Sequence, residues 1–189
     1  MAAHRFAKAL RRSLALGVLA LTLALPVLAY DTGQTVQPFT GTDASGKTHS
    51  LAAYKGKTVV VVVWGSLTCK PYASQLAKLN KQFSKVVWLG VAPNAGESAA
   101  AIRKAKSAQK IAFPVLLDSG GTISKAFGAQ MMPTVFVIGP AGKLRYQGAI
   151  ADKPSQPKKA YLADALRAVA AGKSPSPAKT TVRGFRIRY

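Results

Sequence analysis

The sequence predicts an α/β three-layer sandwich, in which a central mixed sheet carries helices on both faces. Two apolar runs, Thr58–Trp64 and Val86–Ala92, are continuous rather than alternating, which is typical of strands buried on both faces. Segments with the apolar spacing of helices lie between the strand-like runs. Two late apolar segments flank a tight turn and add an antiparallel hairpin.

The first elements follow from local patterns. Residues 30–50 are polar and rich in Thr and Gly, so we expect an N-terminal arm with a short hairpin. After the first buried strand, Tyr72, Leu76, Leu79 and Phe83 are spaced four, three and four residues apart, which places them on one face of a helix.

The later elements alternate in the same way. We expect further helices over Ala95–Gln109, Thr122–Phe127 and Tyr161–Ala171, and strands over Phe113–Leu117, Thr134–Ile138 and Leu144–Gly148. The last two strands are joined by Gly139-Pro140-Ala141-Gly142, where Pro at the second position and Gly at the fourth fit a type I turn.

Length and composition limit the kind of protein. The chain has 189 residues, enough for one ordinary domain and a targeting segment, and a 49% apolar content can form a core. It holds one Cys, so an intramolecular disulfide is excluded. With two His and no Cys cluster, we expect no metal site, and no cofactor is predicted.

The N-terminal segment predicts export. Residues 1–13 carry four basic side chains and no acid, Leu14–Ala29 is an apolar run, and Val27-Leu28-Ala29 fits a cleavage site. We therefore expect a signal peptide cleaved after Ala29 and a periplasmic or secreted protein; the alternative is an uncleaved membrane anchor. The predicted organisation is a signal peptide (1–29), one domain (30–173) and a basic C-terminal tail (174–189).

The charge says more about partners than about fold. A formal net charge of +21 favours nonspecific contact with polyanions, although a solvated basic surface is the alternative. No nucleic-acid-binding module is recognisable, so specific nucleic-acid binding is not expected. We also expect the protein to be a monomer.

The candidate site surrounds Cys69, which follows a buried strand and a sharp turn and begins a helix. Unpaired backbone N–H groups at a helix start and the charge of Lys70 both favour the thiolate, so the thiol should titrate below its free value of about 8.5. Pro71 fits the first helical turn. The alternative is a buried and inert cysteine.

The segments VVVVVWGSLTCKPY and MPTVFVI, the latter followed by GKLRYQG, resemble the thioredoxin-like redoxin family, the alkyl hydroperoxide reductase/thiol-specific antioxidant superfamily. The C-terminal segment from ALRAVAAGKSPSP to TTVRGFRIRY is similar to the end of an exported subgroup. The resemblance implies a thioredoxin-like sandwich in which Pro133 is cis and faces Cys69. A trans Pro at a strand start is the alternative.

The departures from the family decide the chemistry. Tyr72 stands where thioredoxins have the second, resolving Cys, and Gly184-Phe185 stands where exported redoxins often have another. A disulfide needs two sulfurs, so Cys69 would act as a monothiol, and an external reductant thiol must release its mixed disulfide.

We expect catalytic roles for Cys69 as the nucleophile, for Lys70, whose charge stabilises the thiolate, and, as the resemblance implies, for Pro133. Two of the further candidates, Trp64 and Met132, could equally be core residues. Seven further residues are candidates for substrate binding: Trp64, Ser66, Thr68, Pro71, Tyr72, Met132 and Thr134.

Three functions remain open. The first is a monothiol thiol-disulfide oxidoreductase of the cell envelope, acting on a protein or small-molecule thiol or disulfide. The second is a catalytically degenerate binding module for proteins or polyanions, favoured because no acid lies in the first strand or the Cys69 helix to assist proton transfer. The third is a one-Cys peroxidase: Ser66, three residues before Cys69, partly matches the family's T-x-x-C element, but Val62 replaces its Pro.

Overall fold

The computed structural model describes residues 29–66 and 69–189, so the predicted signal peptide before Ala29 lies outside it, as does Thr68. In the described part, no helix is both long and apolar enough to cross a membrane. The elements in chain order are β1 (Thr40–Thr42), β2 (Thr48–Ser50), η1 (Leu51–Tyr54), β3 (Val59–Val63), η2 (Lys70–Tyr72), α1 (Ala73–Gln82), β4 (Val87–Ala92), α2 (Ala99–Ala108), β5 (Val115–Leu117), α3 (Thr122–Ala126), β6 (Met131–Met132), β7 (Thr134–Ile138), β8 (Leu144–Gly148), α4 (Tyr161–Ala170) and β9 (Phe185–Arg186).

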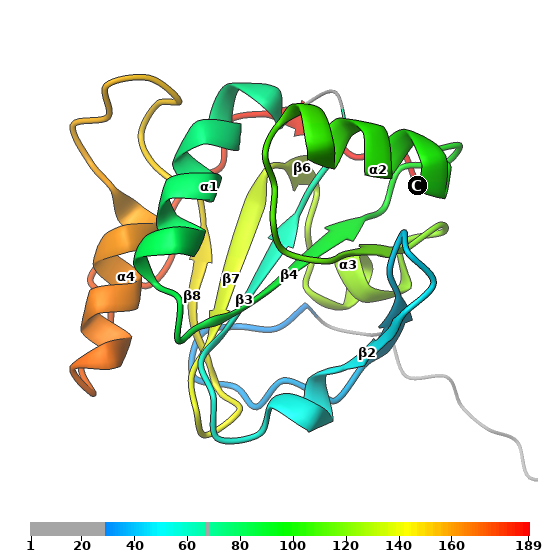
Figure 1. The fold of residues 1–189 in the computed structure, drawn as a ribbon. Coiled ribbons are helices and arrows are strands. Elements are labelled where there is room, and N and C mark those ends of the chain that lie inside the picture. The colour runs from blue at the N-terminus through cyan, green and yellow to red at the C-terminus, as the bar shows by residue number, and fades with distance from the viewer. Residues whose placement is uncertain (1–28, 67–68) are drawn as a thin grey trace, which may run out of the picture.

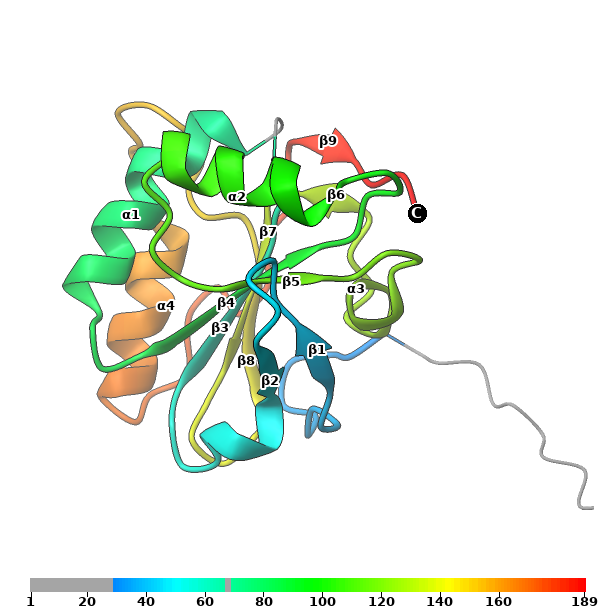
Figure 2. The same cartoon turned by 45° about the vertical axis from the view of Figure 1, so that its right-hand side comes forward.

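The central sheet has five strands in the order β5-β4-β3-β7-β8. Strands β3, β4 and β5 run parallel, whereas β7 and β8 join antiparallel, so the sheet is mixed as predicted. Helices α1 and α4 lie together on one side of the sheet, and α3 and the β1–β2 hairpin lie on the other (Figures 1 and 2). The predicted three-layer architecture is confirmed.

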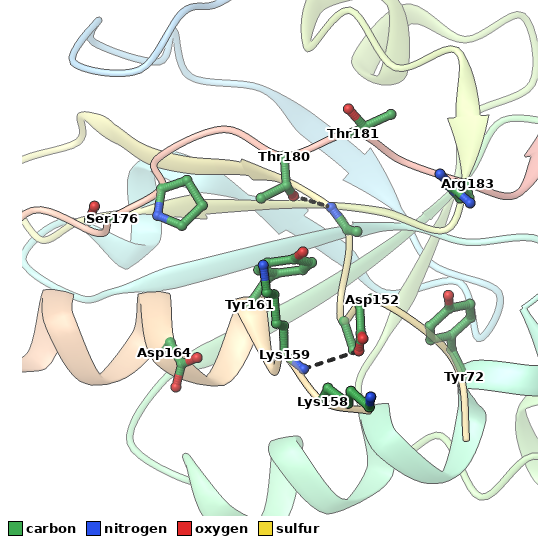
Figure 3. Close-up of a pocket in the computed structure, with 13 residues that line it drawn as sticks. Tyr72, Asp152, Lys158, Lys159, Tyr161, Asp164, Ser176, Thr180, Thr181 and Arg183 are labelled. Atoms are coloured by element: carbon green, nitrogen blue, oxygen red, sulfur yellow. Dashed lines mark hydrogen bonds between the residues drawn. The ribbon is translucent and has the colours of Figure 1, made fainter. Parts of the chain in front are cut away.

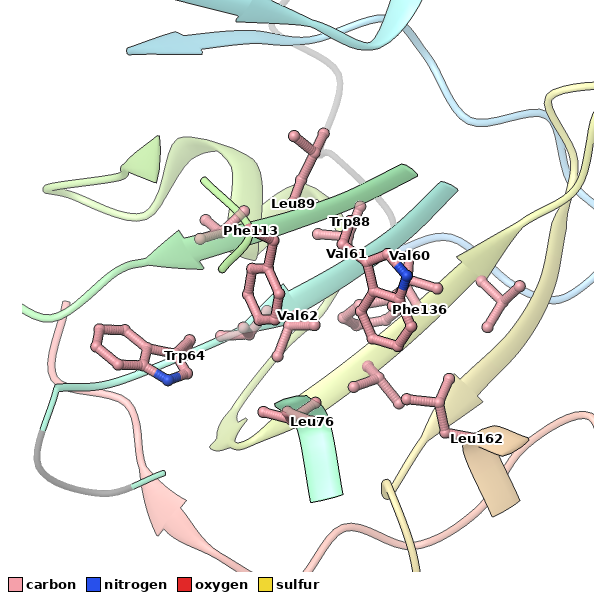
Figure 4. Packing of buried hydrophobic residues seen from close by; sticks show 14 of the residues in the cluster. Val60, Val61, Val62, Trp64, Leu76, Trp88, Leu89, Phe113, Phe136 and Leu162 are labelled. Atoms are coloured by element: carbon pink, nitrogen blue, oxygen red, sulfur yellow. The ribbon is translucent and has the colours of Figure 1, made fainter. Parts of the chain in front are cut away.

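The core is built on β3, whose five valines are all buried. Val61 pairs with Leu89 of β4, so both side chains point to the same face. On the other face, Leu76 of α1 and Leu162 of α4 lie together beneath the strands (Figure 4). Burial on both faces explains why the strand is a continuous apolar run rather than an alternating one.

Two local predictions can be checked directly. The predicted turn is present, because Gly142 N–H donates to the Gly139 carbonyl (2.9 Å). Helix α2 starts at Ala99 rather than at the expected Ala95, since the Ser98 hydroxyl accepts from the Ala101 N–H (3.2 Å) and caps the helix there.

The C-terminal tail is folded onto the domain, which the sequence patterns did not predict. Its first part pairs with β8, where the Thr180 N–H donates to the Gln147 carbonyl (3.0 Å). Its last part forms β9, which pairs antiparallel with β6 and places Phe185 opposite Met132. A two-residue strand with exposed side chains leaves no apolar periodicity in the sequence, so pattern reasoning could not find it.

A buried hydrogen-bond cluster centred on Asp43 holds the β1–β2 hairpin. The two Asp43 carboxylate oxygens accept from His49 Nε2 (2.8 Å), from the Ser45 hydroxyl (2.6 Å) and from the N–H groups of Ser45 (2.8 Å) and Lys47 (3.1 Å). Burial works to raise the pKa of Asp43, but these hydrogen bonds outweigh it and hold the pKa well below its usual range. A lowered pKa means that the carboxylate stabilises the fold at neutral pH and loses this effect in acid.

We predict that Asp43→Asn lowers the free energy of unfolding by about 1–3 kcal/mol at neutral pH, because the buried hydrogen-bond set loses its charge. The difference from the wild type should shrink as the pH falls below about 4, where the unfolded carboxyl becomes protonated. Denaturant unfolding at several pH values measures it. Asp31→Asn, at an exposed carboxyl, is the control. A difference that does not change with pH would contradict this role.

Candidate functional site

Cys69 lies between the end of β3 and the short 3-10 helix η2 that leads into α1. The Cys69 N–H donates to the Gly65 carbonyl (3.2 Å), and the Gly65 N–H donates to the Cys69 sulfur (3.3 Å). Pro71 occupies the first turn, as predicted. The thiol is therefore at a helix start with a backbone donor directed at it, but its side chain is 0% exposed.

Pro133 lies at the same end of the sheet. The Met132–Pro133 peptide bond is cis, which confirms the prediction from the resemblance. The next residue, Thr134, pairs with Val63 at the end of β3, and its hydroxyl donates to the Met131 carbonyl (2.6 Å). The prolyl turn leads into β7 at the same end of the sheet where β3 leads out toward Cys69.

Glu97 is a site residue that the sequence reasoning missed. Its carboxylate accepts from the Ser66 N–H (2.7 Å) and from the Ser66 hydroxyl (2.5 Å). From the other side, the Gln109 side-chain amide donates to the Ser66 carbonyl (2.6 Å). Every polar group of Ser66 is engaged, so the segment before Cys69 is held by two residues from the α2 region.

The sequence did hold a signal for Glu97, namely its position after a buried strand. Glu97 follows β4, which is parallel to β3, so the carboxyl ends of both strands lie at the same end of the sheet. The sequence expectation covers acids within the Cys69 strand and helix, whereas this carboxylate is 31 residues away from Ser66.

The C-terminal tail completes the surroundings of the site. Gly184 packs so closely on β6 that a Cβ there would lie 2.1 Å from the Met132 carbonyl oxygen. The Arg188 N–H donates to the Asn94 side chain (3.1 Å), and the Ala95 N–H donates to the Arg188 carbonyl (2.8 Å). The tail therefore connects the segment before Pro133 with the loop that carries Glu97.

The other predicted site residues fall into two groups. Trp64 and Met132 are fully buried, which agrees with the alternative that they are core residues. The Trp64 indole N–H has no hydrogen-bond partner among the described residues. Lys70 and Pro71 are exposed beside Cys69.

Tyr72 lines an open pocket of about 740 Å³ between the Cys69 segment, the start of α4 and the tail. Lys158, Lys159 and Arg183 bring positive charge to it, and Asp152 accepts from the Lys159 N–H (3.1 Å; Figure 3). Partial burial, and then the charge of Asp152, raise the pKa of the Tyr72 hydroxyl, so it is a neutral donor at physiological pH.

Comparison with known proteins agrees with this arrangement. The model of the AhpC/TSA family matches residues 32–147, which is more than half of the chain. The chain belongs to the AhpC/TSA family. This confirms the resemblance to thioredoxin-like redoxins that the Cys69 and Pro133 segments indicated.

Several known proteins are similar to this chain. The thiol-disulfide oxidoreductase ResA of Bacillus thuringiensis subsp. konkukian is 34% identical over 115 residues, covering 59% of this chain and 66% of that protein, just under two thirds of its length. Among solved structures, a hypothetical protein from Sinorhizobium meliloti matches with a TM-score of 0.77 at 22% identity, covering 86% of this chain and 96% of that one. A secreted disulfide oxidoreductase from Mycobacterium tuberculosis matches with a TM-score of 0.52 at 24% identity, covering 56% and 79%. The structural matches show the thioredoxin-like fold.

We predict that Glu97→Ala increases the rate at which iodoacetamide alkylates Cys69 in the folded protein, because Ser66 loses its acceptor and the segment before Cys69 loosens. Ser98→Ala is a matched control: it removes the cap of α2, at a cost of about 1 kcal/mol, without contacting Ser66. Both variants should lose stability, but Glu97→Ala alone should alter alkylation. Equal rates in the two variants would show that Glu97 only stabilises the fold.

Proposed function

We propose that the protein is an exported thiol-disulfide oxidoreductase that works through Cys69 alone. The observation that carries the proposal is the position of this thiol, at a helix start, with the Gly65 N–H directed at its sulfur and the cis-Pro133 turn at the same sheet edge. The family membership and the ResA relatives support thiol-disulfide chemistry, and the apolar run at residues 14–29 supports export.

The chemistry takes two exchange steps. The Cys69 thiolate attacks one sulfur of a substrate disulfide, the Cys69–sulfur bond forms as the substrate bond breaks, and the second substrate sulfur leaves as a thiolate that takes up a proton. An external thiol, in its thiolate form, then attacks the substrate sulfur of the mixed disulfide, so that a new disulfide joins these two sulfurs as the bond to Cys69 breaks and the Cys69 thiolate is released. The chain holds one sulfur nucleophile of its own, so this second thiol must come from another molecule.

In this proposal two features favour the reactive state. The Gly65 N–H stabilises negative charge on the sulfur, and Lys70, next to Cys69, adds a formal positive charge. Pro133 would orient the incoming sulfur, and the exposed Pro71 and partly buried Tyr72 would contact the partner.

One observation favours the second candidate function, a binding module without catalysis. Cys69 is 0% exposed, and a partner disulfide cannot reach a buried sulfur without movement of the chain. The two candidates make opposite predictions about thiol reactivity.

We predict that the rate of Cys69 alkylation rises with pH around a midpoint below about 8.5, the value of a free cysteine, because the helix start and Lys70 stabilise the thiolate. A glutathione-coupled disulfide-reduction assay should give turnover that Cys69→Ser abolishes. A midpoint at or above the free-cysteine value, together with turnover equal to that of Cys69→Ser, would support the binding module instead.

We predict that Gly184→Ala speeds alkylation of Cys69 severalfold. The added methyl clashes with the Met132 carbonyl and detaches β9 from the segment before Pro133. Deletion of residues 184–189 should have the same effect. Lys179→Ala, which changes an exposed side chain in the same tail, is the control and should react like the wild type. Unchanged alkylation in both tail variants would mean that the tail does not limit access to the thiol.

A further inference from the structure

Helices α1 and α2 lie side by side next to the Cys69 segment (Figures 1 and 2). A groove of about 770 Å³ is lined by residues of both helices. It is separate from the pocket at Tyr72. Ser66 and Lys70 line one part of it, so it opens within a few residues of Cys69 on either side in sequence. A segment bound there would hold its flanking residues beside the thiol.

The floor of the groove is apolar. Five alanines contribute to it, two from α1 and three from α2: Ala73, Ala77, Ala101, Ala105 and Ala108. The spacing on α2 places its three alanines on one face of the helix. Ala101 and Ala108 are exposed, whereas Ala105 is half-buried against the core.

The rim of the groove is positively charged. Lys70, Lys104 and Lys110 line it, and the described lining residues include no acid. All three side chains are exposed, and none of them forms an ion pair with a described residue. The groove thus combines methyl groups on its floor with unpaired positive charge at its edge.

We propose that this groove docks an acidic, amphipathic polypeptide segment of the partner protein whose disulfide or thiol reacts at Cys69. This inference rests on the proposed function and names the class of its partner. Glutamate or aspartate side chains would pair with the lysines, and apolar side chains would cover the alanine floor, as in other helix-in-groove complexes. A polyanion such as a polysaccharide matches the lysines but has no apolar surface for the alanines.

The test measures binding rather than redox turnover. The probe is a fluorescein-labelled, cysteine-free peptide in which glutamates alternate with pairs of leucines, and a second peptide carries lysines in place of the glutamates. Fluorescence anisotropy at physiological salt is recorded with the full chain and with Cys69→Ser. The acidic peptide should bind both proteins equally, and the basic peptide should not bind.

The double variant Lys104→Glu/Lys110→Glu should weaken binding of the acidic peptide about tenfold or more, because it reverses the charge of the rim. Lys55→Glu/Lys57→Glu changes the net charge equally, at exposed residues outside the groove, and should weaken binding less than about threefold. Ala105→Trp fills the floor without altering charge and should weaken binding as the rim variant does.

The outcomes separate this proposal from the proposed function. Equal effects of the two lysine pairs, or unchanged binding in both groove variants, would overturn the docking site. Heparin binding that the groove variants weaken, with no binding of the acidic peptide, would assign the groove to polyanions and also overturn it. The rate of reduction of a small disulfide should be the same in Lys104→Glu/Lys110→Glu and the wild type, so a loss of turnover there would count against docking as the role of these lysines.

Discussion

The hydrogen bonds from Ser66 to Glu97 fix the segment that carries Cys69. They act together with the Gln109 hydrogen bond to the Ser66 carbonyl and with the reciprocal hydrogen bonds between Gly65 and Cys69, one of which directs the Gly65 N–H at the sulfur. A charged acceptor shared by a backbone N–H and a hydroxyl is one of the stronger hydrogen-bond arrangements available to a protein. The position of the thiol therefore depends on Glu97, which is not itself a nucleophile in the proposed exchange.

The same loop also links the thiol to the C-terminal tail. The side chain of Asn94, three residues before Glu97, accepts from the Arg188 N–H. Just before Arg188, β9 pairs with Met132, the residue that precedes Pro133. Cys69, Pro133 and the tail are thus connected through a series of hydrogen bonds that includes the side chains of Glu97 and Asn94. In the proposed function, access to the sulfur and its orientation are coupled, because loosening the tail affects both.

Much of the fold could be predicted because buried strands and amphipathic helices leave periodic signals. The valines of β3 and the helical face at Leu76 and Leu79 are where the sequence indicates. The cis peptide before Pro133 followed from a resemblance rather than from spacing. The strand β9 was missed because two exposed residues leave no periodic signal, whereas Glu97 could be found only from its place after β4, which is parallel to β3.

The most direct measurement of the central claim is mass spectrometry of the native protein after incubation with oxidised glutathione. A reactive thiol without a resolving partner should form one mixed disulfide, on Cys69, that persists after the excess reagent is removed and is released by added thiol. The Cys69→Ser protein should gain no mass. If the native wild type also gains none, and an adduct forms only in denaturant, Cys69 is a core residue and the redox account is wrong.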